Sequence, residues 1–287
     1  MAAPADPAAR VRRTRGTVQI AVPAALIALI VLVAVFPAPF AGLFGAGDVT
    51  DCDLALSRQG PSPGHPFGLD VQGCDLWAQV VHGTRASVSV GVLVTLGCLL
   101  VAAVLGTLAA WYGGWVDSAI GRLIDVFLGF PQLVGLIVVL TVVPVRTVPV
   151  LAAVLVLFTW PHLTRVMRAS ALGVVGSGYV RAAEGIGAAG PRVLLRHVLP
   201  NAAGPVLAVA GLTMAAVITS ESALTFLGVG LQAPSISWGV QLATAQTAFR
   251  SHPHLLVFPA AALTVTVLAF VLLGDALRTR LDPRSRS

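Results

Sequence analysis

The stretch Ala86-Ser-Val-Ser-Val-Gly-Val-Leu-Val-Thr-Leu-Gly-Cys-Leu-Leu-Val-Ala-Ala-Val-Leu-Gly-Thr-Leu-Ala-Ala-Trp111 contains no charged side chain. A helix needs about 20 mostly apolar residues to cross the hydrocarbon core of a bilayer. This stretch exceeds that length, so it predicts a membrane-spanning helix and sets the fold class of the chain.

Other apolar runs extend this prediction along the sequence. Four have the length of a span: Val18–Phe36, Val148–Met167, Ala202–Thr219 and Leu255–Gly274. Residues 115–145 begin with apolar side chains at helical spacing and charged ones on the opposite face, and Pro131 then interrupts the pattern. We interpret them as one kinked span. The sequence therefore predicts an all-α membrane protein with six transmembrane helices.

The composition supports a membrane protein and excludes several kinds of active site. The 287 residues are 56% hydrophobic and 10% charged, whereas soluble domains carry about a quarter charged residues. All 18 basic residues are arginine. A chain without lysine has no Walker A loop and no Schiff-base lysine, so it cannot hydrolyse ATP by the P-loop route.

Arginine placement predicts the orientation, because cytoplasmic segments of membrane proteins are enriched in basic residues. With the N-terminus inside, fourteen arginines fall on inside segments, and four (Arg58, Arg85, Arg146 and Arg250) fall outside. We expect both termini in the cytoplasm. The first run could be a signal peptide, but no convincing cleavage site followed by a soluble domain is evident, so we interpret it as a retained anchor.

This orientation divides the chain into an expected series of segments. Residues 1–36 form the cytoplasmic N-terminus and first span, and residues 37–85 form an extracytoplasmic loop. Residues 86–275 form the core domain, with a cytoplasmic loop at 169–201, and residues 276–287 form a cytoplasmic tail.

The extracytoplasmic loop contains Cys52 and Cys74. Two thiols in an oxidising compartment predict a disulfide; the alternative is two unpaired thiols. In the second outer stretch, His252 and His254 have the spacing of a metal-binding pair, but no third ligand is evident nearby. We expect no metal site.

The cytoplasmic loop carries the most informative sequence, Gly178-Tyr-Val-Arg-Ala-Ala-Glu-Gly-Ile-Gly-Ala-Ala-Gly-Pro-Arg-Val-Leu-Leu-Arg-His-Val-Leu-Pro200. A short helix is expected over Tyr179–Ile186, followed by a break at Gly187. A second helix is expected from Pro191, a residue favoured at the first helical position, to the break at Pro200. This element can transmit a push from a cytoplasmic partner to the membrane; the alternative is a solvated helical loop.

These residues resemble the EAA loop of permeases from ABC importers. The resemblance rests on Arg181-Ala-Ala, Gly187 and Leu199-Pro200. Arg181 stands where the general pattern has glutamate, and His197 stands where isoleucine is usual. Both departures are similar to the variant in peptide permeases. The resemblance implies a coupling role toward an ATPase for eight residues: Tyr179, Arg181, Ala182, Ala183, Glu184, Gly187, Arg192 and Pro200.

Further segments narrow the resemblance to the second permease of dipeptide, oligopeptide and nickel importers. They include His65-Pro-Phe-Gly-Leu-Asp, Tyr112-Gly-Gly-Trp-Val-Asp, Leu224-Thr-Phe-Leu-Gly-Val-Gly and Ser237-Trp-Gly. Cys74 stands where the family tends to have a longer polar residue, which favours the disulfide with Cys52.

The resemblance implies the fold of an ABC type I importer transmembrane domain in a bacterial cell membrane. It also implies a heterodimer with a second permease, one or two ATPase subunits and an extracytoplasmic solute-binding protein. ATP and Mg would be bound by the ATPases, with no cofactor on this chain and no nucleic-acid partner. The implied function is peptide uptake; nickel chelates and haem are alternative cargoes of similar assemblies.

Two outer residues are candidates for contact with the translocation path or the binding protein, Glu221 and Trp238. An intramembrane ionisable residue is a functional candidate by default. The alternative for Glu221 is a helix-end carboxylate packed against the outer loop. An intramembrane enzyme is disfavoured because the chain lacks His-Glu-x-x-His, Gly-x-Gly-Asp and a lysine base. A non-ABC channel or an exporter would not need the EAA-like loop.

Overall fold

The computed structural model describes residues 7–45 and 47–281, with side chains described from residue 19 to residue 280. Its helices are α1 (Pro7–Val35), α2 (Pro37–Ala41), α3 (Leu76–Tyr112), α4 (Gly114–Gly129), α5 (Gln132–Val142), α6 (Val148–Val175), α7 (Gly178–Gly185), α8 (Gly190–Val193), α9 (Leu199–Phe226), α10 (Trp238–Ala245) and α11 (His254–Leu281). Two short turns complete them: a 3-10 turn, η1 (Leu54–Leu56), and a π turn, η2 (Leu194–Val198). The described residues form no strand, so the all-α prediction is confirmed.

Long apolar helices account for most of the predicted spans. Four are long and apolar enough to cross a membrane: α3, α6, the continuous segment Gly190–Phe226 and α11 up to Arg280. The bent pair α4 and α5 makes a fifth if it is taken as one span. The described apolar part of α1, Gln19–Val35, is shorter. The six predicted spans therefore correspond to four long helices, one broken pair and one shorter helix.

The helix pair α4 and α5 has a sharper bend than the kink predicted over residues 115–145. The two helices lie at 84° to each other, which is a sharp break. Pro131 lacks a backbone N–H, and its ring pushes the preceding residue out of the helical region. Phe130 accordingly has φ −90° and ψ 134°, an extended conformation that ends α4.

The helix α3 begins at Leu76, ten residues before the apolar run at Ala86, so the segment between α2 and α3 is residues 42–75; we call it the outer loop, after the side of the membrane predicted for it. Asp75 caps the helix: its carboxylate accepts a hydrogen bond of 3.0 Å from the backbone N–H of Trp77. The first turns of α3 are then buried against the outer ends of the neighbouring helices, for example through Leu76 and Val80. Burial raises the pKa of the Asp75 carboxyl above its ordinary range.

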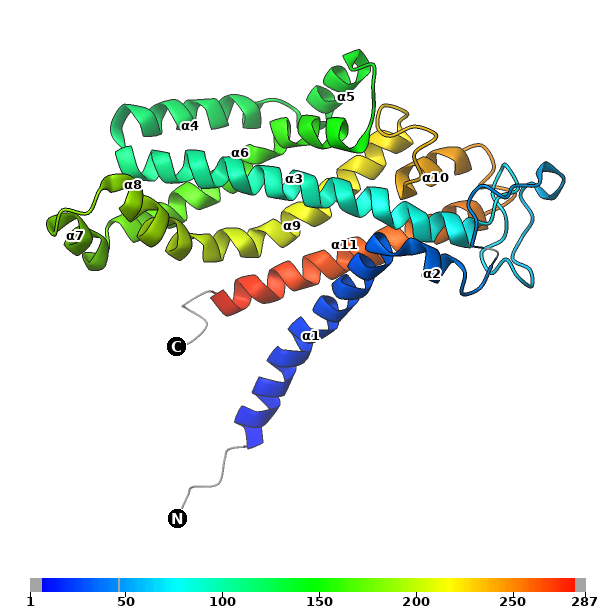
Figure 1. The fold of residues 1–287 in the computed structure, drawn as a ribbon, viewed down its shortest axis with the longest axis horizontal. Coiled ribbons are helices and arrows are strands. Elements are labelled where there is room, and N and C mark those ends of the chain that lie inside the picture. Colours follow the sequence, from blue (N-terminus) through cyan, green and yellow to red (C-terminus); the bar gives the residue numbers. More distant parts are fainter. Residues whose placement is uncertain (1–6, 46, 282–287) are drawn as a thin grey trace.

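The bundle is organised around α3, which runs along the long axis of the molecule (Figure 1). Glycines on α3 allow close contact with its neighbours, as is common between transmembrane helices. A β-carbon at Gly91 would lie 2.8 Å from Ile218 of α9, and one at Gly106 would lie 2.8 Å from Met167 of α6. Figure 1 also shows α7 and α8 at one end of α3 and α10 with the outer loop at the other.

Candidate functional site: the two ends of α9

The helix α7 is the first element of the predicted coupling segment. It spans Gly178–Gly185, which confirms the helix expected over Tyr179–Ile186 to within one residue at each end. Val180 anchors it, because this side chain is fully buried in the main hydrophobic core. Ala183 is half-buried and packs against the same core. The small side chain of Ala183 therefore serves contact within the chain, whereas Ala182 is exposed.

Gly187 ends α7 in the way the sequence predicts, with a backbone conformation that favours glycine. Its φ is +84°, in the left-handed region. The N–H of Gly187 donates to the carbonyl of Glu184 (2.9 Å), and the N–H of Ala188 donates to that of Ala183 (3.1 Å). This pair of bonds is the Schellman arrangement, which satisfies carbonyls that a helix end otherwise leaves unpaired. Gly187 therefore fixes the direction in which the chain leaves α7.

The second helix of the segment begins as predicted and ends differently. Pro191 lies in the first turn of α8, but Pro200 does not end the helix. The segment Gly190–Phe226 is continuous through the π turn at Leu194–Val198. In this turn the N–H of Leu199 donates to the carbonyl of Leu194, five residues back. The wider turn comes where the ring of Pro200 would otherwise meet a carbonyl of the preceding turn.

The surface of the segment is polar except for three large exposed side chains, one of which is Leu195 of the π turn, 64% exposed. Ile186 is 86% exposed and Tyr179 is 49% exposed. Arg181, Glu184 and Arg192 are also exposed, and within the described residues none of the three forms an ion pair. Their charged groups are therefore available to a partner. By contrast Val193 and Val198 are fully buried and hold α8 and the π turn against the core.

Glu221 lies near the opposite end of α9. Its side chain is fully buried, so in this conformation it touches neither a solute nor a partner protein. Three hydroxyls donate to its carboxylate: Thr225 at 3.0 Å, Ser222 at 3.2 Å and Ser237 at 3.3 Å. The hydroxyl of Ser87 on α3 also interacts with it. The alternative expectation, a packed carboxylate at the end of the helix, describes this position.

Trp238 is buried beside this cluster and is likewise no surface contact. Its indole N–H donates to the carbonyl of Val80 on α3 (3.0 Å), and its backbone N–H donates to the hydroxyl of Ser87 (3.2 Å). The side-chain amide of Gln241 donates to the carbonyl of Gln79 (2.7 Å). We call Glu221, its four hydroxyl partners and Trp238 the polar clasp. The clasp joins α10 to α3 and α9.

The hydroxyls of the clasp were missed by sequence reasoning, which singled out only Glu221 and Trp238. Ser222 and Thr225 lie within four residues of Glu221 on α9, whereas Ser237 caps α10 and Ser87 belongs to α3. A hydroxyl in an apolar span usually bonds to its own helix backbone. Four hydroxyls around one carboxylate are a product of how three elements pack.

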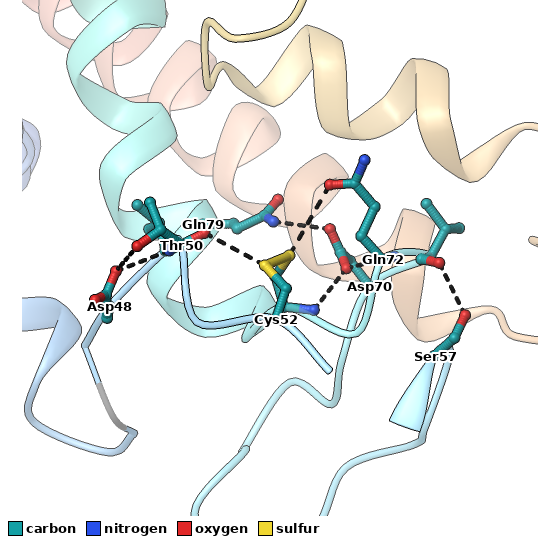
Figure 2. Close-up of a disulfide and its surroundings, with 10 residues drawn as sticks. Asp48, Thr50, Cys52, Ser57, Asp70, Gln72 and Gln79 are labelled. Atoms are coloured by element: carbon teal, nitrogen blue, oxygen red, sulfur yellow. Dashed lines mark hydrogen bonds between the residues drawn. A yellow bond between two sulfur atoms is a disulfide. The ribbon is translucent and has the colours of Figure 1, made fainter. Parts of the chain in front are cut away.

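The outer loop is closed by a disulfide between Cys52 and Cys74 in the structure, with the sulfur atoms 2.02 Å apart (Figure 2). Asp70 organises the same region: its carboxylate accepts hydrogen bonds from the backbone N–H groups of Gln72 and Cys74 and from the side chain of Gln79, at 2.7–2.8 Å. Because Gln79 belongs to α3, Asp70 attaches the closed loop to the bundle. Among the described residues, no group of three His, Cys, Asp or Glu side chains is placed to hold a metal ion.

Comparison with known proteins places these features in a family. Residues 102–287 match the family model described as "Binding-protein-dependent transport system inner membrane component". The chain is 31% identical to the dipeptide transport system permease protein DppC of Alkalihalophilus pseudofirmus, over 92% of this chain and 86% of that protein. It is 33% identical to the glutathione transport system permease protein GsiD of Pectobacterium atrosepticum, over 93% of this chain and 88% of that protein.

A third relative agrees with this assignment, and one solved structure has a similar fold. The oligopeptide transport system permease protein OppC of Bacillus subtilis is 32% identical, over 91% of this chain and 84% of that protein. The crystal structure of an amino acid ABC transporter with histidines has a similar fold, with a TM-score of 0.54 and 16% identity, over 71% of this chain and 94% of that chain. The chain therefore belongs to the family of binding-protein-dependent transport system inner membrane components, and it is a multi-pass permease subunit of the bacterial inner membrane.

Proposed function

We propose that this chain is the second-permease subunit of an ABC importer that takes up peptides. The observation that carries the proposal is the agreement among relatives, whose names refer to dipeptide, oligopeptide and glutathione transport. The similarity extends over more than nine-tenths of this chain, so it includes both the coupling segment and the outer loop. The polar, exposed surface of α7 is consistent with a chain that receives its energy from another subunit.

The proposed orientation places α7 in the cytoplasm. The fourteen-to-four distribution of arginines supports this orientation, with both termini on the inner side. The first span and its N-terminal extension then occupy residues 1–36, the transport core residues 86–275 and the cytoplasmic tail residues 276–287. The disulfide-closed loop and α10 lie on the outer side, where a solute-binding protein would dock. Oxidising conditions outside the cell support the same assignment for Cys52 and Cys74.

The proposed mechanism uses α7 as a coupling helix. In this proposal Tyr179, Ile186 and the free charges of Arg181 and Glu184 contact a groove on an ATPase subunit, which binds ATP and Mg. Ala182 lets the two surfaces approach closely. ATP binding draws the ATPases together and biases the permease pair toward one of two states, and hydrolysis resets it.

The geometry explains how a movement of α7 can reach the membrane. Gly187 directs the chain into α8, and Arg192 lies in the last turn of that helix. From Gly190 the helix continues through Pro200 into the span, so a displacement of α7 and α8 acts directly on α9. A heterodimer with a second permease is part of the proposal, because a single chain encloses only one side of a pathway.

The proposal is tested by purification and transport together. We expect this chain, tagged and expressed in its native host, to co-purify with a second permease and an ATPase subunit. We also expect its deletion to abolish the uptake of radiolabelled dipeptides and oligopeptides while amino acid uptake continues. Normal peptide uptake in the deletion strain would contradict the peptide cargo. Loss of nickel or haem uptake instead would assign the alternative cargo to the same assembly.

A further inference from the structure

A charged pocket lies between α4 and α6, apart from the coupling segment and the polar clasp. It has a volume of about 370 Å³. Two ion pairs cross it: Arg165 of α6 donates to Asp125 of α4 (2.9 Å), and Arg168 of α6 pairs with Asp117 of α4. Sequence reasoning noted charges on this face of α4 but did not pair them with α6. The volume falls within the range of small-molecule sites in proteins.

A third arginine gives the pocket an excess positive charge. Arg122 lines it, is exposed, and forms no ion pair within the described part of the chain. The three arginines outnumber the two aspartates, so the pocket has a formal charge of one positive unit. Each guanidinium has five N–H donors, more than a single carboxylate can use, and its planar shape matches a phosphate group.

The position of the pocket along α6 corresponds to the surface of a membrane. Arg146 precedes the apolar part of α6, and Arg165 is the first charged residue within that helix. At 1.5 Å per residue, Arg165 and Arg168 lie about 26–30 Å from Val148 along the helix axis. The hydrocarbon core of a bilayer is about 30 Å thick. The two arginines therefore reach the level of the lipid headgroups on the side of α7.

Exposed aromatic residues independently place this end of α4 at the level of the lipid headgroups. Trp115 is 81% exposed and Tyr112 is 64% exposed; both lie at the turn between α3 and α4, and Trp115 precedes Asp117 by two residues on α4. Exposed Trp and Tyr residues concentrate at membrane–water interfaces, where the ring is partly solvated. Further along α4, Leu123 and Val126 are 45% and 70% exposed, so the helix presents an apolar surface toward the membrane interior.

From these observations we infer that the pocket binds the phosphate of an anionic phospholipid headgroup, with Arg122 as the primary contact. The acyl chains would lie along the exposed apolar side of α4. Basic pockets between transmembrane helices recognise anionic headgroups in this way. A bound lipid would hold α4 against α6 close to the coupling segment. The inference concerns lipid binding and does not depend on the identity of the cargo.

A cargo peptide is the competing occupant, since its carboxylate could also bind arginine. The lipid is favoured because Trp115 and Val126, on the same helix as Arg122, have the exposure of interfacial and lipid-facing side chains. A helix that lines a path for polar solutes would not need either.

The test measures lipid binding to the intact complex purified in detergent, by native mass spectrometry during titration with phosphatidylglycerol. We expect Arg122→Gln to weaken binding at one site about tenfold, equivalent to the loss of one charge-assisted contact. Arg122→Lys keeps the charge but not the fork of donors, so its effect should be intermediate. Arg250→Gln makes the same charge change in the outer stretch and serves as the matched control.

Comparison of phosphatidylglycerol with diacylglycerol and with a dipeptide distinguishes binding of the phosphate headgroup from binding of acyl chains or of cargo. Diacylglycerol has the acyl chains without the phosphate, and it should bind equally to wild type and Arg122→Gln. Excess dipeptide should leave phosphatidylglycerol bound. Displacement by the peptide would overturn the inference in favour of a cargo site, and unchanged phosphatidylglycerol affinity in Arg122→Gln would overturn it outright.

Discussion

The chain has two glutamates, and they are used in opposite ways. Glu184 on α7 is exposed and has no ion-pair partner within the described residues. Glu221 on α9 is fully buried and accepts hydrogen bonds from three hydroxyls. The helix α9 extends from the coupling segment at one end to the polar clasp at the other.

This difference separates the end of α9 that we propose contacts a partner from the end whose polar contacts lie within the chain. A buried carboxylate is tolerated only when surrounding groups satisfy it, and removal of the carboxylate leaves those groups unsatisfied in turn. An exposed carboxylate contributes little to folding, since water replaces any contact it loses. The same residue type should therefore give stability defects at one end of α9 and transport defects at the other.

The largest effect on stability is expected for Glu221→Leu. The substitution leaves the hydroxyls of Thr225, Ser222 and Ser237 without their acceptor, at a cost of about 3 kcal/mol or more. Thermal unfolding of the purified protein should shift to a clearly lower temperature. Glu184→Leu is the matched control and should unfold as wild type does. Equal unfolding temperatures for the two variants would break the comparison.

The disulfide should have the next largest effect, confined to the outer end. Cys52→Ser opens a loop of the size for which closure contributes about 3 kcal/mol to the order of the loop. We expect faster proteolysis between residues 47 and 74, with little change in the unfolding of the helical bundle. Cys98→Ser, a change at a buried thiol inside α3, is the control for loss of a thiol. Peptide mapping without reductant that recovered both outer thiols free would contradict the bond.

Gly187→Val should affect both stability and transport. Because Gly187 has φ +84°, a branched side chain strains the backbone by about 1–2 kcal/mol and redirects the exit from α7. A β-carbon there meets no neighbouring atom, so the strain at this carbon comes from the backbone conformation. Uptake should fall sharply while the protein remains in the membrane. Gly185→Ala, two residues earlier at the last position of α7 and without a positive φ, should transport normally.

Glu184→Arg should have the smallest effect on stability and a clear effect on function. The side chain is exposed, so we expect no shift in unfolding temperature. Reversal of its charge, beside Arg181, should weaken the contact with the ATPase and uncouple ATP hydrolysis from uptake. Glu184→Gln should be milder. Wild-type uptake in Glu184→Arg would show that Glu184 is not part of the proposed contact with the ATPase. The contact would then rest mainly on Tyr179 and Ile186.

Sequence patterns predicted well those elements whose conformation depends on residues close by in the chain. The apolar run at Ala86–Trp111 and the glycine at Gly187 each act through the chain around them, and both lie where expected. The prediction that Pro200 ends a helix was wrong. The π turn at Leu194–Val198 makes room for the proline ring, so the helix continues through Pro200. The predicted kink at Pro131 is a sharp 84° break, since packing sets the angle once proline has interrupted the hydrogen bonds.

The sequence by itself determined the all-α membrane fold, the absence of a P-loop and the short helix α7 with its glycine stop. Each follows from composition or from spacing within a few residues, where the bilayer and the backbone leave little choice. Only the tertiary structure decided that Glu221 and Trp238 face inward and that Arg165 and Arg168 meet Asp125 and Asp117. Those contacts join residues far apart in the sequence, and the relative rotation of packed helices determines them.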